Sequence, residues 1–162
     1  MAEYSRDIGI WLGKKAFNDN QIKDLKSKLT SDIIIRVYGL AGVGKGTLSS
    51  TLASTLGIPV FDSGKIWRAL TYIYNDLALE DTLENTQLVF SKIDVFQDNT
   101  TIRIRYGNKI FQESDLKNAF IDARVFGYAA KEVNQQEFFK FNVKAYTQKI
   151  NTAFVIDARG AN

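Results

Sequence analysis

The residues best suited to chemistry lie in one glycine-rich segment, Gly39-Leu40-Ala41-Gly42-Val43-Gly44-Lys45-Gly46-Thr47. Glycines let the backbone curl so that several N–H groups point at one centre and bind phosphate oxygens. A lysine there reaches the outer phosphates, and the threonine after it can help to hold Mg²⁺. We therefore expect a site for a nucleoside triphosphate, ATP with Mg²⁺, built from Gly39, Gly42, Gly44, Lys45, Gly46 and Thr47.

Such a loop needs a strand before it and a helix after it. The apolar run at 33–38 predicts a buried strand of a parallel sheet. Leu48, Leu52 and Leu56 then recur at helical spacing, and Gly57 ends the pattern. This order would turn the positive N-terminal end of the helix toward the phosphates.

A second polar group follows the next short strand, predicted at 58–61. Asp62 and Ser63 come directly after it, so we expect them at the same sheet edge as the glycine-rich loop. Arg68 follows on a helix predicted from about Lys65 to Leu79, and its planar guanidinium is suited to a monophosphate. The structural alternatives are a helix cap for Ser63 and a solvated side chain for Arg68.

The apolar period changes to two further along the chain. Ile102, Ile104 and Tyr106 alternate with arginines up to the turn at Gly107 and Asn108, which predicts a small antiparallel β unit at about 93–111. A helical pattern is expected over 120–133.

A last apolar strand, predicted at about 153–157, ends at Asp157. A carboxylate there can act on Mg²⁺ through water, and Arg159 can neutralise phosphate charge. The alternative is a capping Asp157 and a surface Arg159. These elements predict an α/β fold.

Composition excludes several chemistries. The 162 residues include no Cys and no His, which rules out disulfides, the usual zinc sites and Ser-His-Asp triads. Phosphoryl transfer needs little acid–base catalysis. The net charge is only +3 and no Lys/Arg-rich run occurs, so we expect no nucleic-acid partner. No apolar run approaches the roughly 20 residues of a membrane span. We expect a cytoplasmic protein with no membrane association and no obligate protein partner.

Residues 33–70 together resemble the cytidylate (CMP) kinases, a bacterial-type family of P-loop nucleoside monophosphate kinases. The resemblance rests on the G-K-G-T loop, the leucine-striped helix, a short strand and Asp62-Ser63-Gly64-Lys65-Ile66-Trp67-Arg68, where Trp67 replaces the family's usual Tyr. It implies a three-layer α/β/α P-loop NTPase fold and Mg²⁺-dependent transfer of the γ-phosphoryl group of ATP to CMP or dCMP, in pyrimidine nucleotide metabolism. It also implies that Asp62, Ser63 and Arg68 line the acceptor pocket, with Arg68 on the phosphate.

The resemblance further implies catalytic roles for Lys45, Asp157 and Arg159, metal contacts from Thr47 and Asp157, and an acceptor-side role for the 93–111 insert. The sequence departs from the family in three places. The family's D-G-R-D is Asp157-Ala158-Arg159-Gly160 here, and its acceptor-reading serine and arginine align with Gly127 and Gln136. Arg124 could substitute for that arginine, and the base that is read stays open.

The predicted organisation is a helical N-terminal extension at 1–31 and a P-loop kinase domain at 32–162, with the monophosphate-binding region at about 62–135. Members of the family continue past the last strand with further core elements and an arginine-bearing lid. We therefore expect this chain to correspond to the N-terminal portion of such a kinase, without lid and C-terminal core, and to turn over poorly by itself.

Three alternatives stay open. The acceptor could be another monophosphate such as AMP, because adenylate kinases share a looser S/T-G-x-x-x-R motif. The chain could be a nucleotide-binding module without turnover. A GTPase is the third, since Asp157 to Gly160 match D-x-x-G, but Asn108-Lys109-Ile110-Phe111 lacks the Asp of N-K-x-D.

Overall fold

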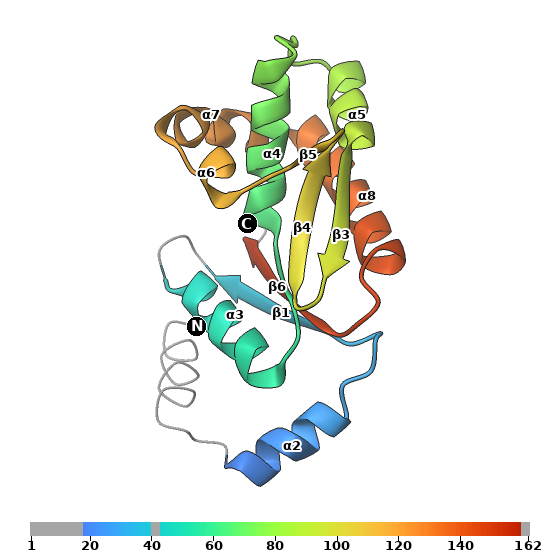
Figure 1. Ribbon diagram of the computed structural model, residues 1–162. Coiled ribbons are helices and arrows are strands. Elements are labelled where there is room, and N and C mark those ends of the chain that lie inside the picture. Colours follow the sequence, from blue (N-terminus) through green and yellow to red (C-terminus); the bar gives the residue numbers. More distant parts are fainter. Residues whose placement is uncertain (1–17, 40–42, 160–162) are drawn as a thin grey trace. The chain divides into compact units, whose positions relative to one another are not determined.

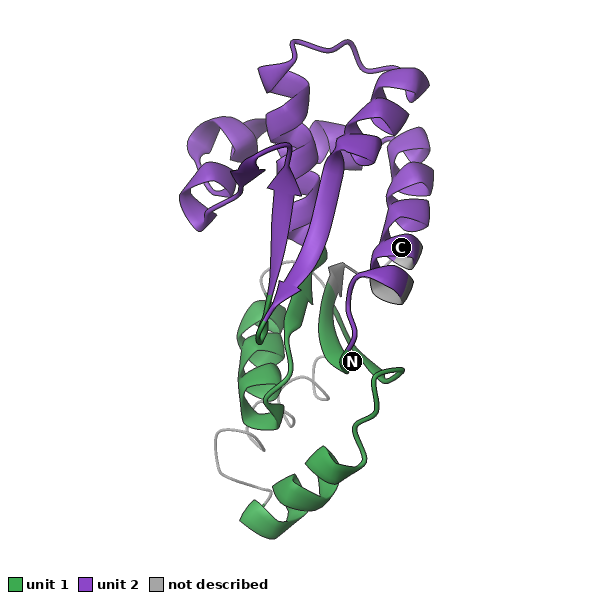
Figure 2. Cartoon of the chain, turned by 45° about the vertical axis from the view of Figure 1, so that its right-hand side comes forward, with its two compact units in different colours: residues 1–63, 99–101, 152–162 green, residues 64–98, 102–151 purple. Residues whose placement is uncertain are grey.

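The computed structural model describes residues 18–39 and 43–159, which form two compact units (Figure 2). Unit 1 takes its described residues from 1–63, 99–101 and 152–162, and unit 2 consists of 64–98 and 102–151. Of the predicted extension at 1–31, residues 1–17 lie outside the described residues. The boundary predicted after residue 31 stays a prediction.

Unit 1 is built on three parallel strands, β1 (Ile34–Gly39), β6 (Phe154–Arg159) and β2 (Val60–Asp62). The strand that comes last in the sequence, β6, lies in the middle and pairs in parallel with both neighbours (Figure 1). Its residues 154–156 are buried, as expected for a central strand of a parallel sheet. The predicted α/β class with a parallel core sheet is confirmed.

Helix α3 (Lys45–Leu56) follows β1 and packs against this sheet. It ends at Gly57, whose φ of 72° is the left-handed conformation common after helices. The predicted leucine stripe contributes to a core that α3 shares with β1, β6 and the segment before β2. The buried members of this core are Val37, Ala53, Leu56, Ile58, Ala153 and Val155.

The N-terminal helix α2 (Asp19–Ser27) begins with a capping box. The Gln21 N–H donates to Asn18 Oδ1 and the Asn18 N–H donates to Gln21 Oε1, each at 2.9 Å. Leu29 lies beyond the last residue of this helix and packs against the core of unit 1.

Unit 2 contains the remaining elements, and its insert is the predicted antiparallel β unit. Its helices are α4 (Ser63–Asp76), α5 (Leu83–Lys92), α6 (Glu113–Leu116), α7 (Ala119–Ala129) and α8 (Glu132–Gln148). Its strands are β3 (Ile93–Asp98), β4 (Thr101–Tyr106) and β5 (Lys109–Ile110), of which β4 pairs with both others. Ser63 and Thr101, the first residues of α4 and β4, belong to unit 1.

Four predicted boundaries were wrong. Helix α4 begins at Ser63 rather than near Lys65, because β2 passes into it without an intervening loop, and it ends at Asp76 rather than at Leu79. Strand β6 does not end at Asp157. It continues to Arg159, because β1 remains in register with it as far as Gly39. Val133 belongs to α8, since α7 ends at Ala129.

A polar network lies inside unit 2, where Tyr74, Thr86 and Asn134 are each 0–1% exposed. The Tyr74 and Thr86 hydroxyls are 2.7 Å apart, and the Thr86 hydroxyl donates to Asn134 Oδ1 at 2.6 Å. Asn134 Nδ2 donates to the Tyr128 carbonyl at 2.9 Å. One asparagine on α8 therefore ties α5 to the end of α7, and buried polar groups depend on such partners.

We predict that Asn134→Ala lowers the free energy of unfolding by about 2–4 kcal/mol, because it removes two buried hydrogen bonds and leaves a cavity in place of the amide. The matched control is Gln135→Ala, which removes the neighbouring but exposed bond from Gln135 Nε2 to the Ala129 carbonyl at 3.0 Å. The control should cost under about 0.5 kcal/mol. Urea denaturation measures both, and equal losses would contradict a specific role for the buried network.

Candidate functional site

The first turn of α3 presents backbone N–H groups at the end of β1. Gly44, before the helix, has φ 87° and ψ 13°, and the first helical hydrogen bond runs from the Leu48 N–H to the Gly44 carbonyl at 3.0 Å. The N–H groups of residues 44–47 therefore lie ahead of the helical ladder, where they point beyond the helix N-terminus. This is an arrangement that binds anions.

The predicted loop residues are placed as follows. Gly39 ends β1, Gly44 precedes α3, and Lys45, Gly46 and Thr47 form the first turn of α3. The Lys45 side chain is half-buried, and Thr47 is exposed. Gly42 lies outside the described residues.

Asp157 lies beside this turn. In the sheet it stands at the level of Val37 on one side and of Asp62 on the other. A methyl group added at Gly46 would be 3.5 Å from Asp157 Oδ2, so the carboxylate directly borders the start of α3. The carboxylate predicted for the metal is thus brought together with the loop.

Ser63 and Asp62 belong to the same neighbourhood within unit 1. Ser63 is 7% exposed, and its hydroxyl donates to the Asp157 carbonyl at 2.9 Å. This bond crosses from the start of α4 to β6, so it ties Ser63 to the strand that carries Asp157. Arg159 ends β6 and stands opposite Gly39. The ends of β2 and β6 thus lie at the same edge of the sheet as the end of β1, as predicted.

The two arginines predicted for the acceptor lie in unit 2. Arg68, on α4, donates from Nη1 to the Leu116 carbonyl at 3.0 Å and forms an ion pair with Asp122 of α7. Arg124 is exposed on α7, and its guanidinium carbon is 3.7 Å from the Phe120 ring centroid. The partners of both arginines were missed from the sequence, which carries no local signal for the Arg68 contacts.

Charged residues around α6 are paired in the same way. Lys65 of α4 and Lys117 both bind Glu113, and the Lys65 Nζ–Glu113 Oε2 distance is 2.8 Å. Hydrogen bonds from Lys117 and Lys65 lower the pKa of Glu113 to about 2. The glutamate is therefore ionised at neutral pH and links α6 to the first turn of α4.

The residue that replaces the family's Tyr is part of an aromatic cluster in unit 2. Trp67 stacks on Phe138, with ring centroids 4.3 Å apart and planes at 21°. The Trp67 and Phe90 rings meet edge to face, with their centroids 6.5 Å apart. The half-buried indole thus packs against α5 and α8.

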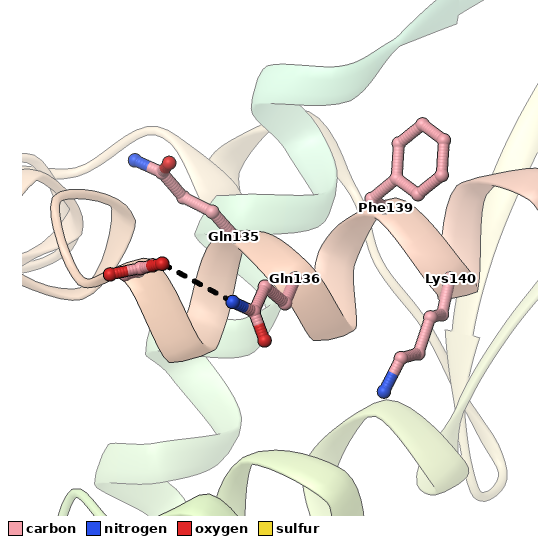
Figure 3. A pocket seen from close by; sticks show the side chains of 5 residues that line it. Gln135, Gln136, Phe139 and Lys140 are labelled. Carbon is pink, nitrogen blue, oxygen red and sulfur yellow. Dashed lines mark hydrogen bonds between the residues drawn. The ribbon is translucent and has the colours of Figure 1, made fainter.

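A surface hollow of about 400 Å³ lies along the exposed face of α8, lined by Glu132, Gln135, Gln136, Phe139 and Lys140 (Figure 3). Gln136 Nε2 donates to Glu132 Oε1 at 3.3 Å. Gln136 is the position that aligns with the family's arginine, and Gly127, the other departure, is exposed on α7. The residues predicted for the acceptor, Asp62, Ser63, Arg68 and Arg124, do not line this hollow.

The donor set suits a weakly held Mg²⁺ rather than a dedicated cage. Among residues 18–39 and 43–159, no three His, Cys, Asp or Glu side chains form a metal-binding group. Mg²⁺ in phosphate sites keeps waters and takes one or two protein ligands plus substrate phosphates. A single carboxylate, Asp157, and the Thr47 hydroxyl fit that description.

Within the described part of the chain, no helix combines the length and the apolar character that crossing a membrane requires. Asn108 and Lys109, which begin the imperfect N-K-x-D match, lie at the β4–β5 hairpin. That position gives no support to the guanine-reading alternative.

Comparison with known proteins agrees with these features. The family model described as cytidylate kinase matches residues 35–160. A cytidylate kinase of Haemophilus ducreyi is 43% identical over 61 residues, which cover 36% of this chain and 27% of that protein. Cytidylate kinases of Shewanella oneidensis and Shewanella denitrificans are 42% and 44% identical over 64 residues, 38% of this chain. The chain thus matches little more than a quarter of the length of these curated relatives, 27–28%.

Gly44 and Gly57 flank α3 with left-handed φ values of 87° and 72°, and a Cβ at either would meet nothing within 4 Å. We predict that Gly44→Ala and Gly57→Ala each destabilise the chain by about 1–2 kcal/mol through backbone strain alone. Only Gly44→Ala should also weaken ATP binding, because it displaces the N–H groups of the first turn. Thermal unfolding and calorimetric titration measure the two effects. Equal ATP affinities in both variants would show that Gly44 does not contribute to ATP binding.

Proposed function

This chain belongs to the cytidylate kinase family, and on that premise we propose that it binds ATP at the start of α3 and transfers the γ-phosphoryl group to CMP or dCMP. The observation that carries the proposal is the position of Asp157. Its carboxylate borders Gly46 in the first turn of α3 and stands level with Asp62 in the sheet. A triphosphate at the helix N-terminus would therefore have a carboxylate beside it and the acceptor motif one strand away.

Phosphoryl transfer is catalysed mainly by positioning and by neutralising charge that spreads over the transferring group. In our proposal the N–H groups of residues 44–47 cradle the phosphates, and Lys45 reaches the β- and γ-phosphates. Arg159, at the end of β6 opposite Gly39, adds positive charge. Thr47 and Asp157 would hold Mg²⁺, which would supply positive charge against the phosphates.

The acceptor side is proposed to use Asp62, Ser63, Arg68 and Arg124. The hydrogen bond from Ser63 to β6 fixes the start of α4 relative to Asp157. Arg68 belongs to the same helix but lies in unit 2. Because a guanidinium binds a phosphate with two parallel hydrogen bonds, Arg68 is suited to the acceptor's monophosphate.

Triphosphate binding should depend on Lys45. We predict that Lys45→Ala weakens ATP binding about 10- to 100-fold, the value of one charge-assisted hydrogen bond, while the unfolding temperature stays unchanged. The matched control is Lys28→Ala, which removes an exposed lysine of unit 1 that pairs with Asp24 at 2.7 Å. Calorimetry should show wild-type affinity in the control. Equal ATP affinity in Lys45→Ala and wild type would overturn the assignment of the loop.

The acceptor should be a pyrimidine monophosphate. We expect CMP or dCMP to bind at least about tenfold more tightly than AMP, a difference of 1.4 kcal/mol. A coupled ADP-release assay with CMP, dCMP, UMP and AMP tests transfer, and calorimetry with the same four tests binding. A preference for AMP would assign the chain to a different acceptor. CMP binding without ADP release would support the alternative of a binding module.

A further inference from the structure

The Arg68 guanidinium is held through one of its nitrogens, Nη1. Nη1 donates to the Leu116 carbonyl of α6 at 3.0 Å and pairs with Asp122 Oδ1 of α7. A guanidinium nitrogen of this kind carries two hydrogens, so the carbonyl and the carboxylate account for both. Within the described residues, both side-chain hydrogen bonds of Arg68 run through Nη1.

Two fixed bonds on one nitrogen of a planar group fix the plane of the whole group. The opposite edge, formed by Nε and Nη2, carries two parallel N–H groups, which is the fork that matches phosphate oxygens. The Arg68 side chain is only 22% exposed, whereas that of Asp122 is 52% exposed. The half-exposed Asp122 therefore restrains the partly buried Arg68 guanidinium on its solvent side. The orientation of the Nε–Nη2 edge, which matches phosphate oxygens, is fixed at the same time.

Fold stability alone is a weak reason for this pair. Ion pairs with a half-exposed partner contribute little, about 0–1 kcal/mol in most measurements. The neighbouring pair of Lys65 and Glu113 already links α4 to α6. What the Arg68 contacts add is orientation of a planar guanidinium, whose two parallel N–H groups a flexible lysine cannot offer to a phosphate.

We propose that Asp122, together with the Leu116 carbonyl, is a positioning residue that holds Arg68 with its Nε–Nη2 edge presented to the acceptor's phosphate. The inference rests on the proposed function, since it takes the acceptor to be a nucleoside monophosphate. Asp122 itself does not touch the acceptor. Its effect passes through Arg68, in the way outer-shell hydrogen bonds orient groups that bind a ligand.

The test measures dissociation constants of the full chain for CMP and for cytidine, which lacks the phosphate. Asp122→Ala should weaken CMP binding about three- to tenfold and leave cytidine binding unchanged, as expected when an orienting bond is lost. Asp122→Asn keeps an Oδ1 acceptor and should restore most of the affinity. Arg68→Ala should weaken CMP binding about 10- to 100-fold. Adding Asp122→Ala to Arg68→Ala should then change nothing further.

The matched control is Glu113→Ala, which removes the carboxylate that pairs with the other α4 cation, Lys65, at 2.8 Å. CMP affinity should stay at the wild-type value there. Arg68→Lys keeps the positive charge without the planar edge, so it carries the test if Asp122→Ala does not fold. It should weaken CMP binding by about tenfold.

Three outcomes would overturn the inference. Tighter CMP binding in both Asp122 variants would show that the carboxylate competes with the phosphate. Equal effects of Asp122→Ala and Glu113→Ala would show a merely structural ion pair, and full affinity in Arg68→Lys would show that orientation does not matter. A failed inference leaves the proposed function standing as long as the wild-type chain binds CMP. A wild-type chain that binds ATP but no CMP would instead contradict the proposed acceptor itself.

Discussion

The position of β6 between β1 and β2 is the constraint on which the phosphate site depends. Parallel pairing on both sides places Val37, Asp157 and Asp62 at one level of the sheet. Because side chains alternate between the faces of a strand, a shift of β6 by one residue would move Asp157 to the other face, away from Gly46. The same shift would break the bond between the Ser63 hydroxyl and the Asp157 carbonyl. Register, more than any single side chain, assembles the site.

The site uses residues that are locally unfavourable for folding. Gly44 precedes α3 without a side-chain cap, and Gly46 stands in the first helical turn. Glycine in a helix costs about 1 kcal/mol relative to alanine, and glycine in place of a polar N-cap costs about a few tenths of a kcal/mol more. The apolar core shared by α3, β1 and β6 offsets these losses. Such a local conflict is expected where backbone N–H groups serve a ligand rather than the fold.

The sequence predicts much of unit 1, because strand, loop and helix are set by local patterns. The leucine spacing of α3, the Gly57 end and the placement of Asp62 after β2 follow from periodicity and turn residues. The continuation of β6 through Arg159 does not, since it depends on pairing with a strand more than a hundred residues away. The partners of Arg68 lie 48 and 54 residues further along the chain. Contacts of that range leave no trace in local spacing.

The measurement that tests the central claim most directly is the Mg²⁺ dependence of ATP affinity in wild type and in Asp157→Asn. If register places this carboxylate at the phosphate site, the wild-type chain binds ATP more tightly with Mg²⁺ than with a chelator, and Asp157→Asn loses most of that difference. Asp32→Asn, at an exposed position of unit 1 before β1, should keep the wild-type difference. An undiminished Mg²⁺ dependence in Asp157→Asn would contradict the account.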